Sequence, residues 1–151
     1  MNDMLRLLGI RTEGFALVLA DAGAVPVVRL SGNGDGEVVA PLDRTLKQLH
    51  DELVDASVRS VVVDLGELYF MNSSCLKAFV SWIYKVRTSG KPYQIRIQYN
   101  PNQRWQQRGL EPLQRLAPAV VFLDQIGASK AAGASGAASA ASGQVDGGRN
   151  G

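Results

Sequence analysis

Four consecutive residues, Asn72, Ser73, Ser74 and Cys75, interrupt two apolar runs and carry groups that could do chemistry. A serine hydroxyl can accept a phosphate, which adds a charge of about −1.5 to −2 at neutral pH. A cysteine near a helix N-terminus can have a lowered pKa and act as a nucleophile. Asn72 is also a good helix N-cap, so a purely structural role would account for the small polar residues. The segment is therefore a candidate modification site, a candidate catalytic site or a helix cap.

Residues that would complete an enzyme site are scarce. His50 is the only histidine, and it falls on a different predicted helix with no evident link to Cys75, so a cysteine hydrolase is a minor alternative. The sequence has no HExxH, GxSxG or paired-cysteine motif, and the glycine-rich segment 32–37 lacks the lysine of a phosphate-binding loop. We therefore expect no enzyme, no metal site and no cofactor.

Size and composition set the class of protein. A chain of 151 residues that is 46% hydrophobic can form one globular domain with a core. The net charge of +2 implies no strong attraction to nucleic acid or anionic lipid. Cys75 is the single cysteine, which excludes an internal disulfide and fits a reducing compartment. No run reaches the roughly 20 apolar residues of a membrane span, so we expect a soluble cytoplasmic protein.

The composition changes sharply near residue 127. From there to the end, 19 of 25 residues are Ala, Gly or Ser. Such a segment cannot bury enough apolar area to offset the entropy lost on ordering it. We predict a single domain over residues 1–126 and a disordered tail over 127–151.

Hydrophobic patterns predict the elements that position the polar segment. Two strands over 15–20 and 25–31 are close enough to form a hairpin. An amphipathic helix over 41–56, with Leu49 on its apolar face, leads to a continuous apolar strand over 60–65, typical of a buried sheet centre. The later elements are a helix over 73–87, a strand over 93–99, a helix over 102–117 that Gly109 and Pro112 could kink or split, and a strand over 119–123. The order β-β-α-β-α-β-α-β predicts an α/β fold with a mixed β-sheet and packed α-helices.

The segment VVVDLGELYFMNSSCLKAF, residues 61–79, resembles the signature of the STAS family, the anti-sigma-factor antagonist domains. That signature has an apolar strand ending in Asp, a short link, an aromatic residue, and then Asp-Ser-Ser/Thr-Gly-Leu opening a helix. Asp64 matches the end of the strand, Phe70 the aromatic residue and Leu76 the apolar residue after the glycine. The segment VVRLSG, residues 27–32, is similar to an early strand of the family. The resemblance covers the domain without the tail and implies a STAS-like single domain.

The resemblance also implies a regulatory protein-binding module switched by phosphorylation. Ser74 stands just before the family's glycine position and is the implied phospho-acceptor, with Ser73 as the runner-up. The implied partners are a serine kinase that acts as an anti-sigma factor and a serine phosphatase. A phosphate near a helix N-terminus would be tolerated, so its charge would act mainly on a docked partner. The implied motif and partner surface also includes Asp64, Asn72, Cys75, Leu76 and Lys77.

Two residues depart from the family pattern. Asn72 replaces the Asp, so it can cap a helix but lacks the negative charge. Cys75 replaces the glycine and is expected to place a side chain beside the acceptor. The alternative function is therefore a STAS docking or scaffold subunit of a signalling or transporter complex that is never phosphorylated. The partner's identity and the oligomeric state stay open.

Other conspicuous side chains have ordinary interpretations. We expect Trp82 and Trp105 to be core residues more than partner anchors, and His50 to be a partly exposed helix residue. A basic face of Arg104, Arg108 and Arg115 on the last helix is expected to be a solvated surface.

Overall fold

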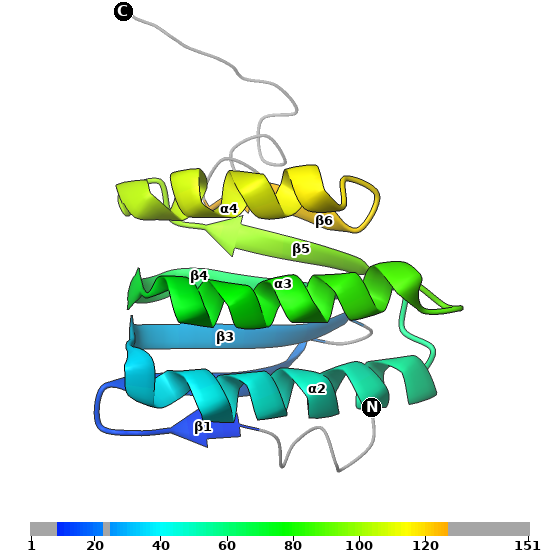
Figure 1. Ribbon diagram of the computed structural model, residues 1–151, viewed down its shortest axis with the longest axis horizontal. Helices are drawn as coiled ribbons and strands as arrows, with labels where there is room; N and C mark the ends of the chain where they lie inside the picture. The colour runs from blue at the N-terminus through cyan, green and yellow to red at the C-terminus, as the bar shows by residue number, and fades with distance from the viewer. Residues whose placement is uncertain (1–8, 23–24, 127–151) are drawn as a thin grey trace, which may run out of the picture.

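The computed structural model describes residues 9–22 and 25–126, which form one six-stranded sheet covered by helices (Figure 1). The strands are β1 (Gly9–Arg11), β2 (Phe15–Ala22), β3 (Val25–Gly34), β4 (Ser60–Met71), β5 (Gln94–Tyr99) and β6 (Val121–Gln125). The helices are the short 3-10 helix η1 (Gly36–Val38), α2 (Val39–Asp55), α3 (Ser73–Thr88) and α4 (Arg104–Leu116). The predicted α/β order is confirmed, with β1 as an additional three-residue strand. The predicted tail lies outside the described residues.

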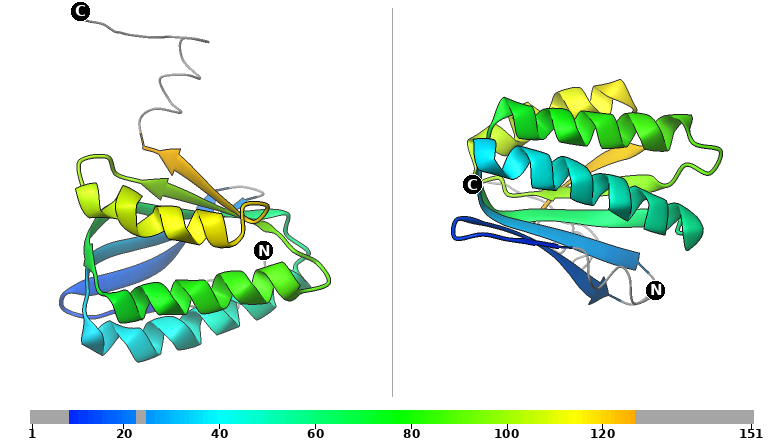
Figure 2. Two further views of the ribbon diagram at one scale, coloured as in Figure 1. Left: turned by 45° about the horizontal axis from the view of Figure 1, so that its top comes forward. Right: turned by 60° about the horizontal axis from the view of Figure 1, so that its bottom comes forward.

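The sheet is mixed, and its strands follow one another in chain order. β1, β2 and β3 pair antiparallel, whereas β3, β4, β5 and β6 are parallel neighbours. Each parallel crossover adds its strand on the same side of the preceding one, and such crossovers are right-handed. Helices α2, α3 and α4 therefore all lie on one face of the sheet (Figure 2). The strand order contains no reversal, so it has no switch point of the kind that forms the ligand crevice in doubly wound folds.

The core fills the space between this face and the helices. Buried strand residues include Leu17, Leu30, Val61, Val63, Ile95 and Ile97. Buried helix residues include Leu42, Leu46, Leu49, Leu53, Trp82, Ile83, Leu110 and Leu113. The core positions predicted for Leu49 and Trp82 are thus correct.

The apolar strand predicted over residues 60–65 lies in the centre of the sheet, as expected, but it is not buried on both faces. Val61 and Val63 are fully buried, but Val62 is only half-buried. Side chains of a strand alternate between faces, so Val62 points to the face that carries no described helix. The sequence did not predict this difference, because valine occupies both the buried and the half-buried positions of the run.

The second face of the sheet is partly polar and can face water. Arg29 pairs with Asp64 at 3.2 Å, and Arg96 pairs with Asp124 at the same distance. The Arg96 guanidinium also stacks over the Phe122 ring at 5.1 Å from its centroid. These pairs are exposed or half-buried, so each contributes little to stability.

The last helix is continuous. α4 runs from Arg104 to Leu116 without a break, although Pro112 lies inside it. The sequence left open whether this helix is kinked or split, and the structure shows that it is not split into two helices. Pro112 is exposed, so the Arg108 carbonyl that loses its helical donor lies on a solvent-facing turn.

Candidate functional site

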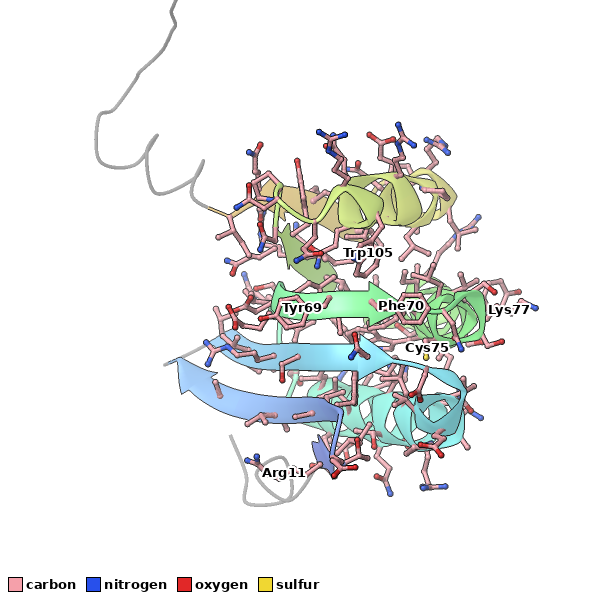
Figure 3. The ribbon with its side chains drawn as sticks, turned by 90° about the vertical axis from the view of Figure 1, so that its left-hand side faces the viewer. Arg11, Tyr69, Phe70, Cys75, Lys77 and Trp105 are labelled. Carbon is pink, nitrogen blue, oxygen red and sulfur yellow. The ribbon has the colours of Figure 1, made fainter. Side chains whose placement is uncertain are left out.

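The polar segment after β4 lies at the edge of the sheet where the parallel strands end. η1 and α2 follow β3, α3 follows β4, and α4 follows β5, so helix N-termini gather at this edge. Figure 3 looks onto this end of the molecule and shows Tyr69, Phe70, Cys75, Lys77 and Trp105 there. Positive ends of helix dipoles and free backbone N–H groups make such an edge favourable for negative charge.

Asn72 is the N-cap of α3, as predicted. Its backbone is extended, and its side-chain oxygen accepts a hydrogen bond from the Cys75 backbone N–H at 2.9 Å. Its own N–H donates to the Gly34 carbonyl at 2.8 Å, which continues the ladder between β3 and β4. The cap fixes the start of α3 relative to the sheet, and with it the two serines that follow.

Ser73 and Ser74 occupy the first turn of α3, and both are exposed. Neither hydroxyl makes a hydrogen bond to a side chain or backbone group within the described ranges. The first turn contains no acidic residue, so no side-chain carboxylate there already compensates the helix dipole. Lys77 is also exposed, and it lies on the same helix face as both serines because residues three and four apart are neighbours.

Cys75 does not belong to this surface, contrary to the prediction that it stands beside the acceptor. The side chain is fully buried, and Sγ lies 3.6 Å from the carbonyl oxygens of Gly34 and Asp35. Burial raises the pKa of the Cys75 thiol, and the Asp35 carboxylate raises it further. A buried thiol with a raised pKa is a poor nucleophile, so the cysteine-hydrolase alternative has no support in the geometry.

Asp64 also lies away from the serines. β4 does not end at Asp64 but continues to Met71, which puts the aspartate roughly 20 Å from the start of α3 at the usual strand rise. Its carboxylate accepts from the Gly66 N–H at 2.9 Å and pairs with Arg29 on the open face of the sheet. Asp64 is therefore not part of a surface around Ser74.

Two irregularities in β4 turn aromatic side chains outward. Against β3, one extra residue is inserted between Asp64 and Glu67 and another between Leu68 and Phe70. Such bulges bend a strand and re-aim its side chains, and they are uncommon in parallel pairs. Tyr69 and Phe70 are 53% and 48% exposed as a result, next to the helix that carries the serines.

Side chains from α4 and from the loop before it donate hydrogen bonds to the unpaired edge of β4. β5 pairs with β4 only as far as Asp64, so the later carbonyls of β4 have no strand partner on that side. The Gln106 amide donates to the carbonyls of Leu65 and Leu68 at 2.9 and 2.8 Å. Two further donors to β4 are Trp105 Nε1, 3.0 Å from the Tyr69 carbonyl, and Asn100 Nδ2, 3.0 Å from the Gly66 carbonyl.

Sequence reasoning missed Asn100 and Gln106. Trp105 is half-buried and packs against the core, as expected, but it also lies beside the aromatic pair and so belongs to the candidate surface as well. Gln106 is fully buried. A signal for Gln106 was available, because it lies at helical spacing from the apolar Leu110 and Leu113 and so on the inward face of α4. Leu76 is half-buried and, like Trp105, lies close to Gly109, where α3 and α4 approach each other.

His50 is buried, contrary to the expectation of partial exposure. Its Nδ1 lies 2.8 Å from the Tyr93 hydroxyl, which also accepts from Trp82 Nε1 at 2.9 Å. The indole can only donate, so the Tyr93 hydroxyl keeps its own proton for a bond to His50 whenever Nδ1 of that ring is unprotonated. Desolvation lowers the pKa of His50 below its ordinary value and raises that of Tyr93. This network joins α2, α3 and the loop before β5 and has no contact with Cys75.

Within residues 9–22 and 25–126, no cluster of three potential metal ligands is found. No helix in the same part of the chain is long and apolar enough to cross a membrane.

Comparison with known proteins gives matches in structure only. No protein-family model matches the sequence, and no curated protein is significantly similar to it. An anti-sigma factor antagonist from Mycobacterium paratuberculosis superposes with a TM-score of 0.52 at 20% identity, over 72% of this chain and 85% of that one. The Bacillus cell fate determinant SpoIIAA, in its phosphorylated form, gives 0.51 at 13% identity over 79% and 98%.

A third similar structure is that of the diguanylate cyclase SiaD in complex with its activator SiaC from Pseudomonas aeruginosa. The matched chain gives a TM-score of 0.55 at 17% identity, over 78% of this chain and 98% of that one. These similarities confirm the fold expected from the sequence, that of the anti-sigma-factor antagonist or STAS domains.

Proposed function

We propose that this chain, which has the STAS fold, is a regulatory protein-binding module that is switched by reversible phosphorylation of Ser74. The observation that carries the proposal is the exposed aromatic pair Tyr69 and Phe70 beside the exposed serines at the start of α3. We call Tyr69, Phe70, Ser73, Ser74 and Trp105 the docking surface.

The docking surface has the composition of a protein interface. Aromatic residues are enriched at the centres of interfaces, where they supply large contact areas with few rotatable bonds. Tyr69 and Phe70 lie on a bulged strand whose carbonyls are held by α4, so their backbone is fixed before a partner arrives. A rigid surface loses less conformational entropy on binding than a flexible one.

Phosphate on Ser74 would change this surface without disturbing the fold. The modified side chain would lie at a helix N-terminus that has no acidic residue in its first turn, and Lys77 is one turn away. An added charge of about −1.5 to −2 beside Phe70 would instead oppose burial of the docking surface by a partner. The switch therefore acts on binding, and no rearrangement of the domain is needed.

The proposed partners are a serine kinase that doubles as an anti-sigma factor and a serine phosphatase, in the cytoplasm. The resemblance of residues 61–79 to the STAS signature supports this assignment. So does the similarity in fold to an anti-sigma factor antagonist and to SpoIIAA in its phosphorylated form. The buried Cys75, whose pKa burial raises, gives no support to the cysteine-hydrolase alternative.

The first experiment is phosphosite mapping of the full chain from its native host, together with affinity capture of partners by the Ser74→Ala and Ser74→Asp variants. We expect phosphate on Ser74, stable partner capture by Ser74→Ala, and at least about tenfold weaker binding by Ser74→Asp, which corresponds to about 1.4 kcal/mol. Ser73→Ala is the matched control for the modified position and should keep phosphorylation of Ser74. Phosphate on Ser73 alone, or none together with parental binding by Ser74→Asp, would refute the switch.

A second candidate function is docking without phosphorylation, and Asn72 favours it because the family's aspartate is missing. Phe70→Ala tests whether partners bind to the docking surface, which both candidate functions require. The substitution should weaken partner binding by about tenfold or more with or without phosphorylation of Ser74. Tyr84, which is also exposed but lies almost three turns after Ser74 along α3, provides the control substitution Tyr84→Ala.

A further inference from the structure

A cavity of about 340 Å³ opens at the end of the molecule opposite the docking surface. It lies where α2 ends and where β4 and β5 begin, at the right-hand end of Figure 1. The strand β4 runs from this end to the docking surface, a distance of roughly 30 Å at the usual rise per residue. A volume of this size is within the range of small-molecule sites.

The lining is mostly apolar, with positive charge at its margin. Leu53, Val54, Val58, Pro92 and Tyr93 contribute apolar atoms, and Ser57 and Gln94 add polar ones. Tyr93 is buried, and its hydroxyl is already occupied by Trp82 and His50. Tyr93 therefore contributes mainly its ring to the wall, and the hydrogen bonds hold that ring in place.

The two charged residues that line the cavity are Arg59 and Lys91, and both are exposed. No acidic residue lines it, and neither cation forms an ion pair with a carboxylate among the described residues. Arg59 comes directly before β4 and Lys91 lies in the loop before β5, so two neighbouring strands bring the charges to one opening. Two cations beside an apolar hollow match a molecule that has an anionic head and an apolar body.

We propose that this cavity binds a small amphipathic carboxylate. The apolar body would lie against Val58, Pro92 and the Tyr93 ring, and the carboxylate between Arg59 and Lys91. Charge-assisted hydrogen bonds from a guanidinium to a carboxylate are stronger than neutral ones, and they fix the orientation of the ligand. The site is separate from the docking surface, at the opposite end of β4.

The test is an NMR titration of the full ¹⁵N-labelled chain with 4-phenylbutyrate and with its neutral analogue 4-phenylbutyramide. Given the usual binding free energy per ligand atom, we expect 4-phenylbutyrate to bind with a Kd of about 1 mM or below. The largest shifts should fall on the amides of Val58, Arg59 and Tyr93. The amide analogue should bind at least about tenfold more weakly, because its neutral carbonyl accepts from the two cations but cannot form an ion pair with them.

The variant for the same titration combines Arg59→Gln with Lys91→Gln, and both positions are exposed, so the fold should be retained. It should weaken 4-phenylbutyrate binding by about tenfold or more, whereas Arg108→Gln on α4 should leave it unchanged. Equal binding of the carboxylate and the amide would overturn the proposal. So would parental affinity in the double variant, or shifts that centre on Tyr69 and Phe70.

Discussion

The Gln106 side-chain amide donates to the Leu68 carbonyl at 2.8 Å. A side chain of α4 thus supplies the hydrogen bond that a neighbouring strand would otherwise give to this edge of β4. The same amide reaches Leu65, and Gln106 Oε1 accepts from the Asn100 backbone N–H at 2.7 Å. Gln106→Leu should lower the free energy of unfolding by about 2–4 kcal/mol, because it leaves buried backbone groups without partners. Denaturant titration measures the loss.

The neighbouring exposed Gln107 provides the matched control. Gln107→Leu should change stability by no more than about 0.5 kcal/mol. Equal effects of the two substitutions would show that the hydrogen bonds of Gln106 are not needed to hold the bulged strand.

Acid should destabilise the protein through His50. Desolvation lowers the pKa of this buried histidine from its ordinary 6.5, with Asp51 opposing the shift and Lys85 adding to it. The unfolded chain then binds the proton more readily, so the contribution to stability is complete above about pH 6.5 and is lost as the pH falls through the folded pKa. Urea titrations at about pH 7.5 and 5.5 should show lower stability at the acidic value.

His50→Gln retains an acceptor for the Tyr93 hydroxyl but cannot be protonated. This variant should lose less stability than the parent between the same two pH values, although other groups titrate equally in both proteins. A pH dependence identical to that of the parent would mean that His50 is not the group responsible.

Truncating a side chain in the core should lower the free energy of unfolding more than truncating one on the open face of the sheet. Leu49 is 1% exposed on α2, and Leu49→Ala should cost about 2–4 kcal/mol by leaving a cavity in the core. Val62 is half-buried on the open face, and Val62→Ala should cost under about 1 kcal/mol. Denaturant unfolding compares the two, and a larger loss for Val62 would mean that its face is covered in solution.

A substitution at Ser57, at the end of α2, should make the protein more stable. It has a φ of 55°, and the bonds from Ser57 N to Val54 O and from Val58 N to Leu53 O form a Schellman motif. Ser57→Gly should stabilise the protein by about 0.5–1 kcal/mol, because glycine adopts this left-handed conformation without strain. Ser57→Ala should not, and thermal melting of the two variants distinguishes backbone strain from loss of the hydroxyl.

The sequence predicted the parts of the fold that depend on local patterns. The order of the main elements and the Asn72 cap follow from hydrophobic spacing and from the preference for asparagine at a helix start. The position of Ser73 and Ser74 in the first turn of α3 follows from the cap. Their exposure agrees with a modifiable site, and phosphorylation itself stays a prediction.

What could not be predicted depends on contacts between distant segments. The end of β4 at Met71, seven residues beyond Asp64, requires the partner strand β3 and the donors from α4. The buried position of Cys75 depends on carbonyls of Gly34 and Asp35, about 40 residues earlier in the chain. Local spacing contains no information about either contact.

The paired bulges in β4 constrain how the length of this segment can vary in evolution. Each bulge shifts the alternation of side chains by one, so Leu65, Leu68 and Met71 all face the core although they are three residues apart. Deleting the extra residue of one bulge would restore ordinary alternation across that bulge and leave Leu65, Leu68 and Met71 facing the core. Deleting a residue from a regular part of β4 would instead reverse the facing of every side chain after the deletion, up to the cap of α3. Related chains are therefore expected to lack one or both extra residues without losing the core, and these extra residues determine whether an aromatic pair is displayed.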